Sequence, residues 1–275
     1  MEDYDAMRVR NHGTSGPRVI VLHGGPAAAG HAVALARGLA DSFQVLEPWQ
    51  RGSGSKPLTV ARHVEDLHEL VESRCKNDRP AFVGESWGAM LALAYAAAYP
   101  RSAGPLVLVG CGTFDKTARA RLHAILEKRT DNDLRQRLDG LPAQFPDPGE
   151  RMLKWQELTR PYYSYDPVPS DDDKSEQAPF DLRAHTETWN SMVTLQEEGI
   201  YPAAFSSIES PVLMLHGTYD PHPGHLIRDS LVPHLPQLEY HEFERCGHSP
   251  WMEKQVQDMF FNLLREWLTL HLTED

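Results

Sequence analysis

The sequence predicts an α/β fold with a mostly parallel central sheet, helices on both faces and an inserted helical cap. Short apolar runs ending in glycine or turn residues recur at 19–22, 43–46, 81–83, 106–109, 212–215 and 238–243. Apolar residues at helical spacing lie between several of these runs, at 28–39, 60–71 and 89–99. Near-continuous apolar strands that alternate with helices indicate a parallel sheet covered on both faces.

The alternation of strands and helices is interrupted once. It stops after Gly110-Cys111-Gly112 and resumes at Ser210-Pro211-Val212, and the residues between show helical or irregular patterns. We therefore predict a core in two parts, residues 1–111 and 207–275, and a helical cap at 112–206. A chain of 275 residues can bury roughly three quarters of its unfolded surface, so disulfides or metals are not needed to hold such a core.

Two further segments carry patterns of their own. Residues 254–270 have apolar side chains at helical spacing and are expected to pack as a last helix against the sheet. Within the cap, residues 161–179 contain four prolines and the run Asp171-Asp172-Asp173, which favours an irregular loop.

Composition restricts the partners that the protein can have. The formal net charge is −12 and the pI is near 5.6, so nucleic acids and anionic membrane surfaces would repel the chain. We expect a neutral or cationic small molecule or short peptide as substrate. The three cysteines lack the spacing of a zinc site or disulfide framework, and the acidic N-terminus has no apolar run of a signal peptide. These features predict a cytoplasmic protein.

The segment Gly84-Glu85-Ser86-Trp87-Gly88 identifies a candidate nucleophile. It follows the apolar run 81–83 and opens the alanine-rich helical pattern, an arrangement that exposes a serine hydroxyl at a sharp turn. Glycines on both sides of such a turn avoid collisions with the neighbouring strand and helix. The alternative interpretation of Ser86 is a helix N-cap flanked by incidental glycines.

A second turn supplies candidate donors for an oxyanion. The run 19–22 ends in His23-Gly24-Gly25-Pro26, and we assign the oxyanion hole to the backbone N–H groups of Gly25 and Trp87. The simpler alternative for 23–26 is a plain tight turn. A serine nucleophile needs such donors as well as a base and a group that orients the base.

Asp220 and His248 complete a predicted catalytic triad with Ser86. Asp220 follows the run 212–215, where a carboxylate would lie at the carboxyl edge of the sheet, and His248 precedes the last helix. Asp220 could instead be an ordinary turn residue, and His248 one incidental histidine among 14. His222 and His225 have the spacing of a metal-binding pair, but Pro221 and Pro223 disfavour the helix it requires. His216 is expected to be structural, and we predict no metal and no cofactor.

These motifs resemble the α/β-hydrolase superfamily and, within it, the proline iminopeptidase branch of serine aminopeptidases. The chain order Ser86, Asp220, His248 is that of the superfamily. The resemblance to the branch rests on His23-Gly24-Gly25-Pro26, on Gln50-Arg51-Gly52-Ser53-Gly54-Ser55 and on Ser86-Trp87-Gly88. The chain departs from the branch at Ala27 and Glu85, where a glycine is usual, and at Trp49, where an aspartate is usual.

The resemblance implies a serine hydrolase that works through an acyl-enzyme, with an aminopeptidase as the leading hypothesis. Iminopeptidases hold the substrate's free amine with acidic residues of the cap, so the candidates for substrate binding are Glu187, Trp189, Glu197 and Glu198. A carboxylic ester or other small acyl compound is the alternative substrate. A binding protein that uses the hydrolase scaffold without catalysis is a more distant alternative.

Overall fold

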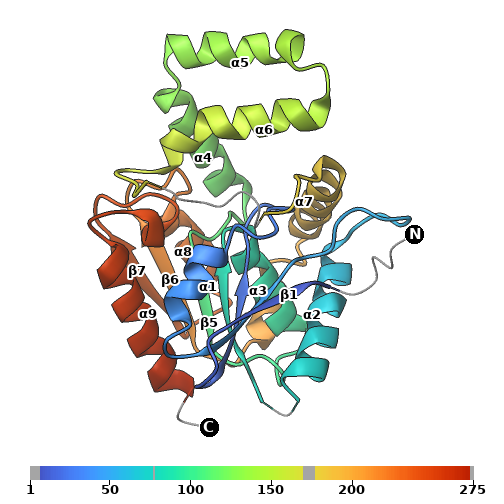
Figure 1. Ribbon diagram of the computed structural model, residues 1–275, viewed down its shortest axis with the longest axis vertical. Coiled ribbons are helices and arrows are strands. Elements are labelled where there is room, and N and C mark those ends of the chain that lie inside the picture. Colours follow the sequence, from blue (N-terminus) through green and yellow to red (C-terminus); the bar gives the residue numbers. More distant parts are fainter. Residues whose placement is uncertain (1–6, 77, 170–176, 273–275) are drawn as a thin grey trace.

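The predicted α/β fold is confirmed by a seven-stranded sheet with helices on both faces (Figure 1). The computed structural model describes residues 7–76, 78–169 and 177–272. The strands lie in the order β1-β3-β2-β4-β5-β6-β7, and all neighbours are parallel except β1 and β3. Their bounds are β1 Val9–His12, β2 Arg18–Leu22, β3 Gln44–Pro48, β4 Ala81–Glu85, β5 Leu106–Val109, β6 Val212–Gly217 and β7 Leu238–Phe243.

Alternate residues of the central strands point into two separate cores. Ile20, Phe82 and Leu108 belong to a core shared with α2 (Val60–Arg74), α3 (Trp87–Ala98) and α8 (Gly224–Leu231). Val21, Val83 and Val107 belong to a core shared with α1 (Val33–Leu39) and α9 (Gln257–Leu272). Because successive side chains of a strand face opposite sides, a strand buried on both sides must be apolar throughout. The burial of the sheet between two layers of helices explains the apolar runs in the sequence.

The first helix is shorter than its sequence pattern predicts. The pattern begins at residue 28, but α1 begins only at Val33. Ala27 and Gly30 both have positive φ, of 69° and 91°, and a residue in that left-handed region cannot continue a right-handed helix. Two other elements, β1 and α8, have no counterpart among the predicted elements. β1 is a half-exposed antiparallel edge strand with a polar sequence, so no apolar run marks it.

The described residues between β5 and β6 are mainly helical. The helices that begin with an aspartate N-cap are α4 (Lys116–Arg129), α5 (Asn132–Gln144), α6 (Pro148–Thr159) and α7 (Leu182–Glu197). Each N-cap carboxylate accepts a backbone N–H from the first helical turn, which satisfies a donor without an intrahelical partner. Two 3-10 turns, η1 (Arg160–Tyr163) and η3 (Ala203–Ser207), complete the segment. Its boundaries as a separate domain remain a prediction.

The cap helices attach to the core in two ways. α5 and α6 form an antiparallel arm that projects above α4 and the sheet, whereas α7 lies against the core (Figure 1). α7 is held by hydrogen bonds from its own side chains: Asp181 accepts from the Ser53 backbone and hydroxyl, Glu187 accepts from the Leu58 N–H, and Ser191 accepts from the Val60 N–H. α7 is thereby fixed to the core.

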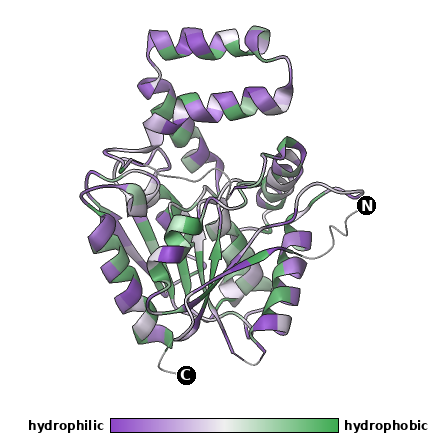
Figure 2. Cartoon of the chain, viewed as in Figure 1, coloured by the Kyte–Doolittle hydropathy of each residue, from purple (hydrophilic) through white to green (hydrophobic). Residues whose placement is uncertain are grey.

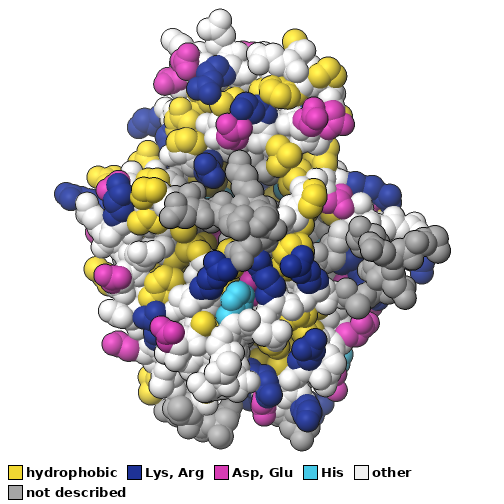
Figure 3. Space-filling model, in the orientation of Figure 1, with side chains coloured by type: hydrophobic (Ala, Val, Ile, Leu, Met, Phe, Trp, Pro, Cys, Tyr) yellow, Lys and Arg dark blue, Asp and Glu magenta, His cyan; other side chains and the backbone are white. Residues whose placement is uncertain are grey.

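The hydropathy of the arm differs from that of the core. The central strands are mainly apolar, whereas α5 and α6 alternate polar and apolar residues (Figure 2). Hydrophobic side chains nonetheless gather on the arm and where it joins the body (Figure 3). The predicted acidic loop residues Asp171-Asp172-Asp173 lie outside the described residues. Among the described residues, no helix is both long and apolar enough to cross a membrane.

Candidate active site

Ser86 lies at a sharp turn between β4 and α3. Its φ is 53°, in the left-handed region that side chains other than glycine rarely adopt, and such strain costs about 1–3 kcal/mol. The Ser86 N–H donates to the Val109 carbonyl at 2.8 Å, which fixes the turn against the end of β5. Strain of this kind persists only where the surroundings enforce it, so the turn marks Ser86 as a functional candidate.

The two glycines of the turn are required by close backbone contacts. A Cβ at Gly84 would lie 2.3 Å from the carbonyl carbon of Gly88, and a Cβ at Gly88 would lie 2.3 Å from the Leu22 carbonyl oxygen. These distances are too short for any side chain. The steric role predicted for both glycines is therefore present in the structure.

The turn after β2 lies directly beside Ser86. A Cβ at Gly24 would be 3.4 Å from the Ser86 Cβ, so the backbone of 23–26 borders the nucleophile candidate. The other predicted donor, the Trp87 N–H, belongs to the first residue of α3 and has no intrahelical acceptor. Gly25, with φ of 119°, follows Gly24 in the same turn. The assignment of the oxyanion hole to Gly25 and Trp87 remains a prediction.

Gln50 links the turn 23–26 to the side chain of Trp87. This role of Gln50 was not predicted from the sequence. Its side chain donates to the His23 carbonyl at 3.0 Å and accepts the Trp87 indole N–H at 2.7 Å. The Gln50 backbone N–H donates to His23 Nε2 at 3.1 Å. Burial lowers the pKa of His23 to about 4, so this ring is neutral and can accept that bond. Gln50 follows β3, which pairs with β2 in the sheet. This strand pairing brings Gln50 next to the turn that follows β2.

Asp220 is fully buried and gathers three histidines. Its Oδ2 lies 2.7 Å from His248 Nδ1 and 3.2 Å from His216 Nε2, and its Oδ1 lies 3.0 Å from His222 Nδ1. Burial alone would raise the pKa of this carboxyl, but the histidines, His248 foremost, hold it well below its usual range. The carboxylate is therefore ionised at neutral pH and accepts from the ring of His248.

His248 is placed between Asp220 and the end of β5. A Cβ at Gly110 would lie 3.0 Å from His248 Nδ1, and Gly110 follows Val109, the residue that accepts the Ser86 N–H. Burial would lower the pKa of His248, but Asp220 and Glu85 outweigh this effect, and the pKa is raised. The fold thus brings the three predicted triad residues to one edge of the sheet.

His222 is a second histidine on the same carboxylate. Its ring stacks on that of His248 with centroids 4.7 Å apart and an interplanar angle of 24°. Burial lowers the pKa of His222, so its ring is neutral. Among the described residues, Asp220, His222 and His248 form a group whose spacing could hold a metal ion. The predicted alternative pair, His222 with His225, is not brought together in this group, because His225 is exposed on α8.

Side chains of the cap and the last loop fix the loops that carry Asp220 and His248. Arg129 of α4 donates to the carbonyls of Tyr162 and Tyr219 at 2.6 and 2.7 Å, and its guanidinium covers the Tyr219 ring. The Tyr163 carbonyl accepts the His248 N–H at 2.7 Å. Buried Glu253 accepts the backbone N–H groups of Gly247, Tyr165 and Asp166. The end of α4, the η1 turn and the residues after it are thus held against the loop that carries His248.

The predicted substrate-binding residues all lie on α7 or at its end. Glu187 accepts the Leu58 N–H at 2.8 Å and pairs with Arg183, which lowers the pKa of its carboxyl. Trp189 packs against the core next to α2 and α3. Glu197 pairs with Lys116 at 3.4 Å, and Glu198 is the exposed C-cap of the helix. Their role in substrate binding remains a prediction.

The order of the strands sets the order of the groups around Ser86. The turn 23–26 follows β2, on one side of β4, whereas Asp220 and His248 follow β6 and β7, on the other side. α7 borders the first side, where His185 Nδ1 lies 3.0 Å from the Pro26 carbonyl. The end of α4 and the η1 turn border the second side through Arg129 and Tyr163. Ser86 therefore lies between α7 on one side and the end of α4 with η1 on the other.

Comparison with known proteins gives one family and several distant relatives. The model of the alpha/beta hydrolase family matches residues 19–259. A proline iminopeptidase of Lactobacillus helveticus is 23% identical over 93% of this chain and 90% of that protein. A cis-3-alkyl-4-alkyloxetan-2-one decarboxylase of Shewanella oneidensis is 30% identical, but the match spans only 38% of this chain and 35% of that protein.

A solved structure shares the fold over nearly the whole chain. The thermophilic esterase of Thermogutta terrifontis superimposes with a TM-score of 0.63 at 20% identity, over 97% of this chain and 94% of that one. At this identity the likeness concerns the fold alone.

Proposed function

Because the chain belongs to the alpha/beta hydrolase family, we propose that it is a serine hydrolase with Ser86 as nucleophile, His248 as base and Asp220 as the residue that orients the base. One observation carries this proposal. The strained turn at Ser86 lies at the same edge of the sheet as Asp220 and His248, which contact each other at 2.7 Å. A conformationally strained serine beside an ionised, histidine-bonded carboxylate is an arrangement suited to nucleophilic catalysis.

The reaction proceeds in two steps with water as the final acceptor. Ser86 Oγ attacks the acyl carbon and His248 Nε2 takes the hydroxyl proton, while Asp220 stays ionised, accepts a hydrogen bond from His248 Nδ1–H and stabilises the imidazolium that forms. The oxyanion is stabilised by the N–H groups of Gly25 and Trp87. The bond to the leaving group breaks as His248 returns the proton to it. Water, deprotonated by His248, then releases the acid and restores Ser86.

Covalent labelling tests the assignment of the nucleophile. A fluorophosphonate probe is expected to label the native protein on Ser86, because an activated serine attacks the phosphorus. Ser86→Ala should lose the label, and Ser249→Ala, a change in a nearby serine that contacts Glu85, should keep it. Mass spectrometry of the labelled peptide identifies the site. A folded native protein without an adduct on Ser86 would rule out the proposed function.

Within this reaction, the leading substrate is a small amide or peptide with a free N-terminus. Two observations support it: the iminopeptidase relatives align over 90% of their length, and α7, which carries Glu187, borders the oxyanion side of Ser86, where the acyl group would lie. A carboxylate near that end could hold the substrate's amine. A carboxylic ester is the second candidate, favoured by a cavity of about 770 Å³ between the cap helices, whose exposed wall is mainly apolar.

A substrate panel separates these two candidates. Prolyl and alanyl arylamides should be turned over, and their N-acetylated forms should react about ten- to a hundredfold more slowly, because a charge-assisted bond to the free amine is lost. Short-chain aryl esters serve as the comparison. Turnover of the esters alone, or equal rates for free and acetylated arylamides, would reject the aminopeptidase assignment and leave the esterase.

A further inference from the structure

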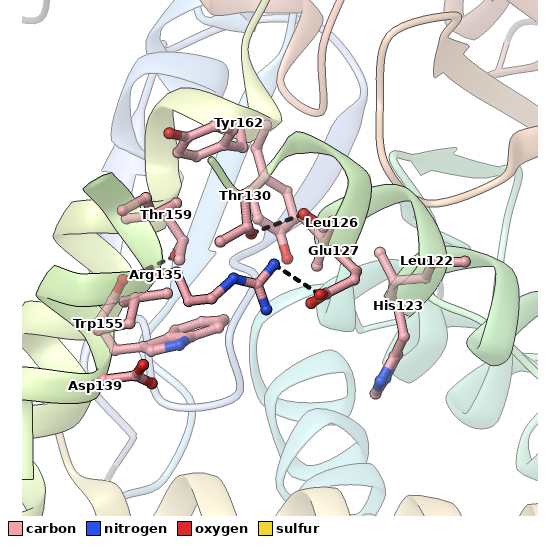
Figure 4. A pocket seen from close by; sticks show the side chains of 14 residues that line it. Leu122, His123, Leu126, Glu127, Thr130, Arg135, Asp139, Trp155, Thr159 and Tyr162 are labelled. Carbon is pink, nitrogen blue, oxygen red and sulfur yellow. Dashed lines mark hydrogen bonds and ion pairs between the residues drawn. The ribbon is translucent and has the colours of Figure 1, made fainter. Parts of the chain in front are cut away.

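A cavity opens between the arm and α4, outside the set of residues assigned to the triad. Its volume is about 770 Å³, which is within the range of small-molecule sites. Its walls come from α4, α5, α6 and η1 (Figure 4). All of its lining residues belong to the segment 112–206.

The lining of this cavity is mainly apolar. Its larger apolar and aromatic side chains are Leu122, Leu126, Leu134, Leu138, Trp155 and Tyr162. Leu122, Leu126 and Leu138 are only partly buried, although they occupy the inner faces of the cap helices. Arg135 reaches from α5 to Glu127 of α4 with a 2.7 Å ion pair, beside the Trp155 ring (Figure 4). Asp139 and His123 also line the cavity, but most of its exposed wall is apolar, so the cavity suits a group that is mainly apolar.

Tyr163 connects the cavity to the proposed base. The residue lines the cavity, and its ring stands edge-on to the ring of His248 with centroids 5.7 Å apart. Burial raises the pKa of the Tyr163 hydroxyl to about 12, so it stays neutral at physiological pH. One wall residue of the cavity therefore contacts the proposed base directly.

The side of the sheet on which the cavity lies decides which part of a substrate it can receive. The oxyanion turn follows β2, on one side of Ser86, and His248 follows β7, on the other. In the proposed reaction His248 gives its proton to the leaving group, so the leaving group must lie on the His248 side. The acyl group lies toward the oxyanion turn and α7.

We propose that the cavity binds the apolar part of the leaving group, so that the preferred substrates combine a small acyl group with a long-chain or aryl alcohol or amine. This proposal rests on the proposed function and specifies its substrate class. For an ester, the Ser86 Oγ–carbonyl bond forms, the carbonyl–alkoxy bond breaks, and the alcohol leaves with the proton from His248. Water then yields the small acid.

A series of acetate esters tests the occupancy of the cavity. From ethyl to hexyl acetate, kcat/KM is expected to rise about two- to fourfold for each added methylene. Burial of one methylene contributes up to about 0.8 kcal/mol, which corresponds to a factor of this size. Acid release in a pH-stat measures the rates below the solubility limit of each ester. Equal kcat/KM for ethyl and hexyl acetate would overturn the proposal.

Two isomeric esters test the orientation. Hexyl acetate and ethyl hexanoate have the same composition, but the long chain is on the leaving group in the first and on the acyl group in the second. Hexyl acetate should have a kcat/KM about tenfold or more above that of ethyl hexanoate, because only its chain reaches the cavity past Tyr163. A preference for ethyl hexanoate would place the cavity on the acyl side and contradict the proposal.

A pair of substitutions tests the location. Ala124 lines the cavity, and Ala143 is an exposed residue of α5 outside the lining. Ala124→Trp should lower the ratio of kcat/KM for hexyl over ethyl acetate about tenfold, because the indole occupies the space of about two methylenes. Ala143→Trp should leave the ratio unchanged. Equal ratios for the two variants, both folded by circular dichroism, would mean that the chain binds elsewhere.

Failure of this proposal can be distinguished from failure of the proposed function. If fluorophosphonate labels Ser86 and ethyl acetate is hydrolysed but chain length has no effect, only the cavity assignment is wrong. If no label forms, the function itself is wrong. Calorimetric binding to Ser86→Ala then still tests the cavity, because hexyl acetate should bind at least tenfold more tightly than ethyl acetate without turnover. Equal affinities would reject the cavity assignment.

Discussion

Replacing His248 with alanine is expected to lower kcat about a millionfold, close to the effect of removing the base in other serine hydrolases. The ring is held by Asp220 at 2.7 Å and by the bond from its own backbone N–H to Tyr163. Without it, nothing takes the proton from Ser86, and the residual rate would come from the oxyanion donors and binding alone. Hydrolysis of p-nitrophenyl acetate and the rate of fluorophosphonate labelling both measure the loss.

His222 is the matched control for this substitution. It contacts the same carboxylate at 3.0 Å and stacks on His248, so His222→Ala removes a similar side chain from the same cluster. We expect a loss of about tenfold, because Asp220 loses one of its partners but His248 keeps its own contact. If His222→Ala abolishes labelling and His248→Ala does not, then His222 is the base and the triad is assigned wrongly.

Replacing Asp220 with asparagine is expected to lower kcat about ten-thousandfold and to move the pH profile. The loss follows from the wrong tautomer, since the asparagine amide can donate to His248 Nδ1 and the ring then presents N–H to Ser86. In the native protein Asp220 raises the pKa of His248 above its ordinary value of 6.5. The base acts only when neutral, so native activity rises as pH increases through this raised pKa.

Removal of the carboxylate leaves burial as the largest effect on His248, and burial lowers its pKa. The acid limb of kcat/KM should therefore shift to lower pH in Asp220→Asn, even though the rates are small. Asp229→Asn, at an exposed aspartate of α8, is the control and should keep the native limb. An unchanged or upward-shifted limb in the Asp220 variant would mean that Asp220 does not set the charge of His248.

The sheet was predictable because its strands carry local signals. The central strands β2, β4, β5 and β6 are buried on both faces, so their residues are mainly apolar, as in Val19 to Leu22 and Leu106 to Val109. β1 escaped prediction for the same reason, because a half-exposed edge strand needs no apolar run. The start of the first helix was wrong, since the sequence pattern contains no sign of the left-handed backbone at Ala27 and Gly30.

The candidate site divides in the same way. Ser86, Asp220 and His248 could be named as candidates because each follows or ends a recognisable strand and because their order fits a known arrangement. Gln50, Arg129, Tyr163 and Glu253 were not, because their partners lie between 6 and 90 positions away in the chain. Contacts over such separations leave no periodic pattern in a single sequence.

The sequence by itself determined the fold class and the candidates for nucleophile, base and orienting acid, because strand burial and turn sterics restrict residue types locally. Only the tertiary structure decided how these groups are ordered around Ser86. The strand order puts the turn 23–26 and α7 on one side of Ser86, and His248, Tyr163 and the end of α4 on the other. That order depends on which strands pair and on where the cap helices pack, and both are set by contacts between distant segments rather than by local patterns.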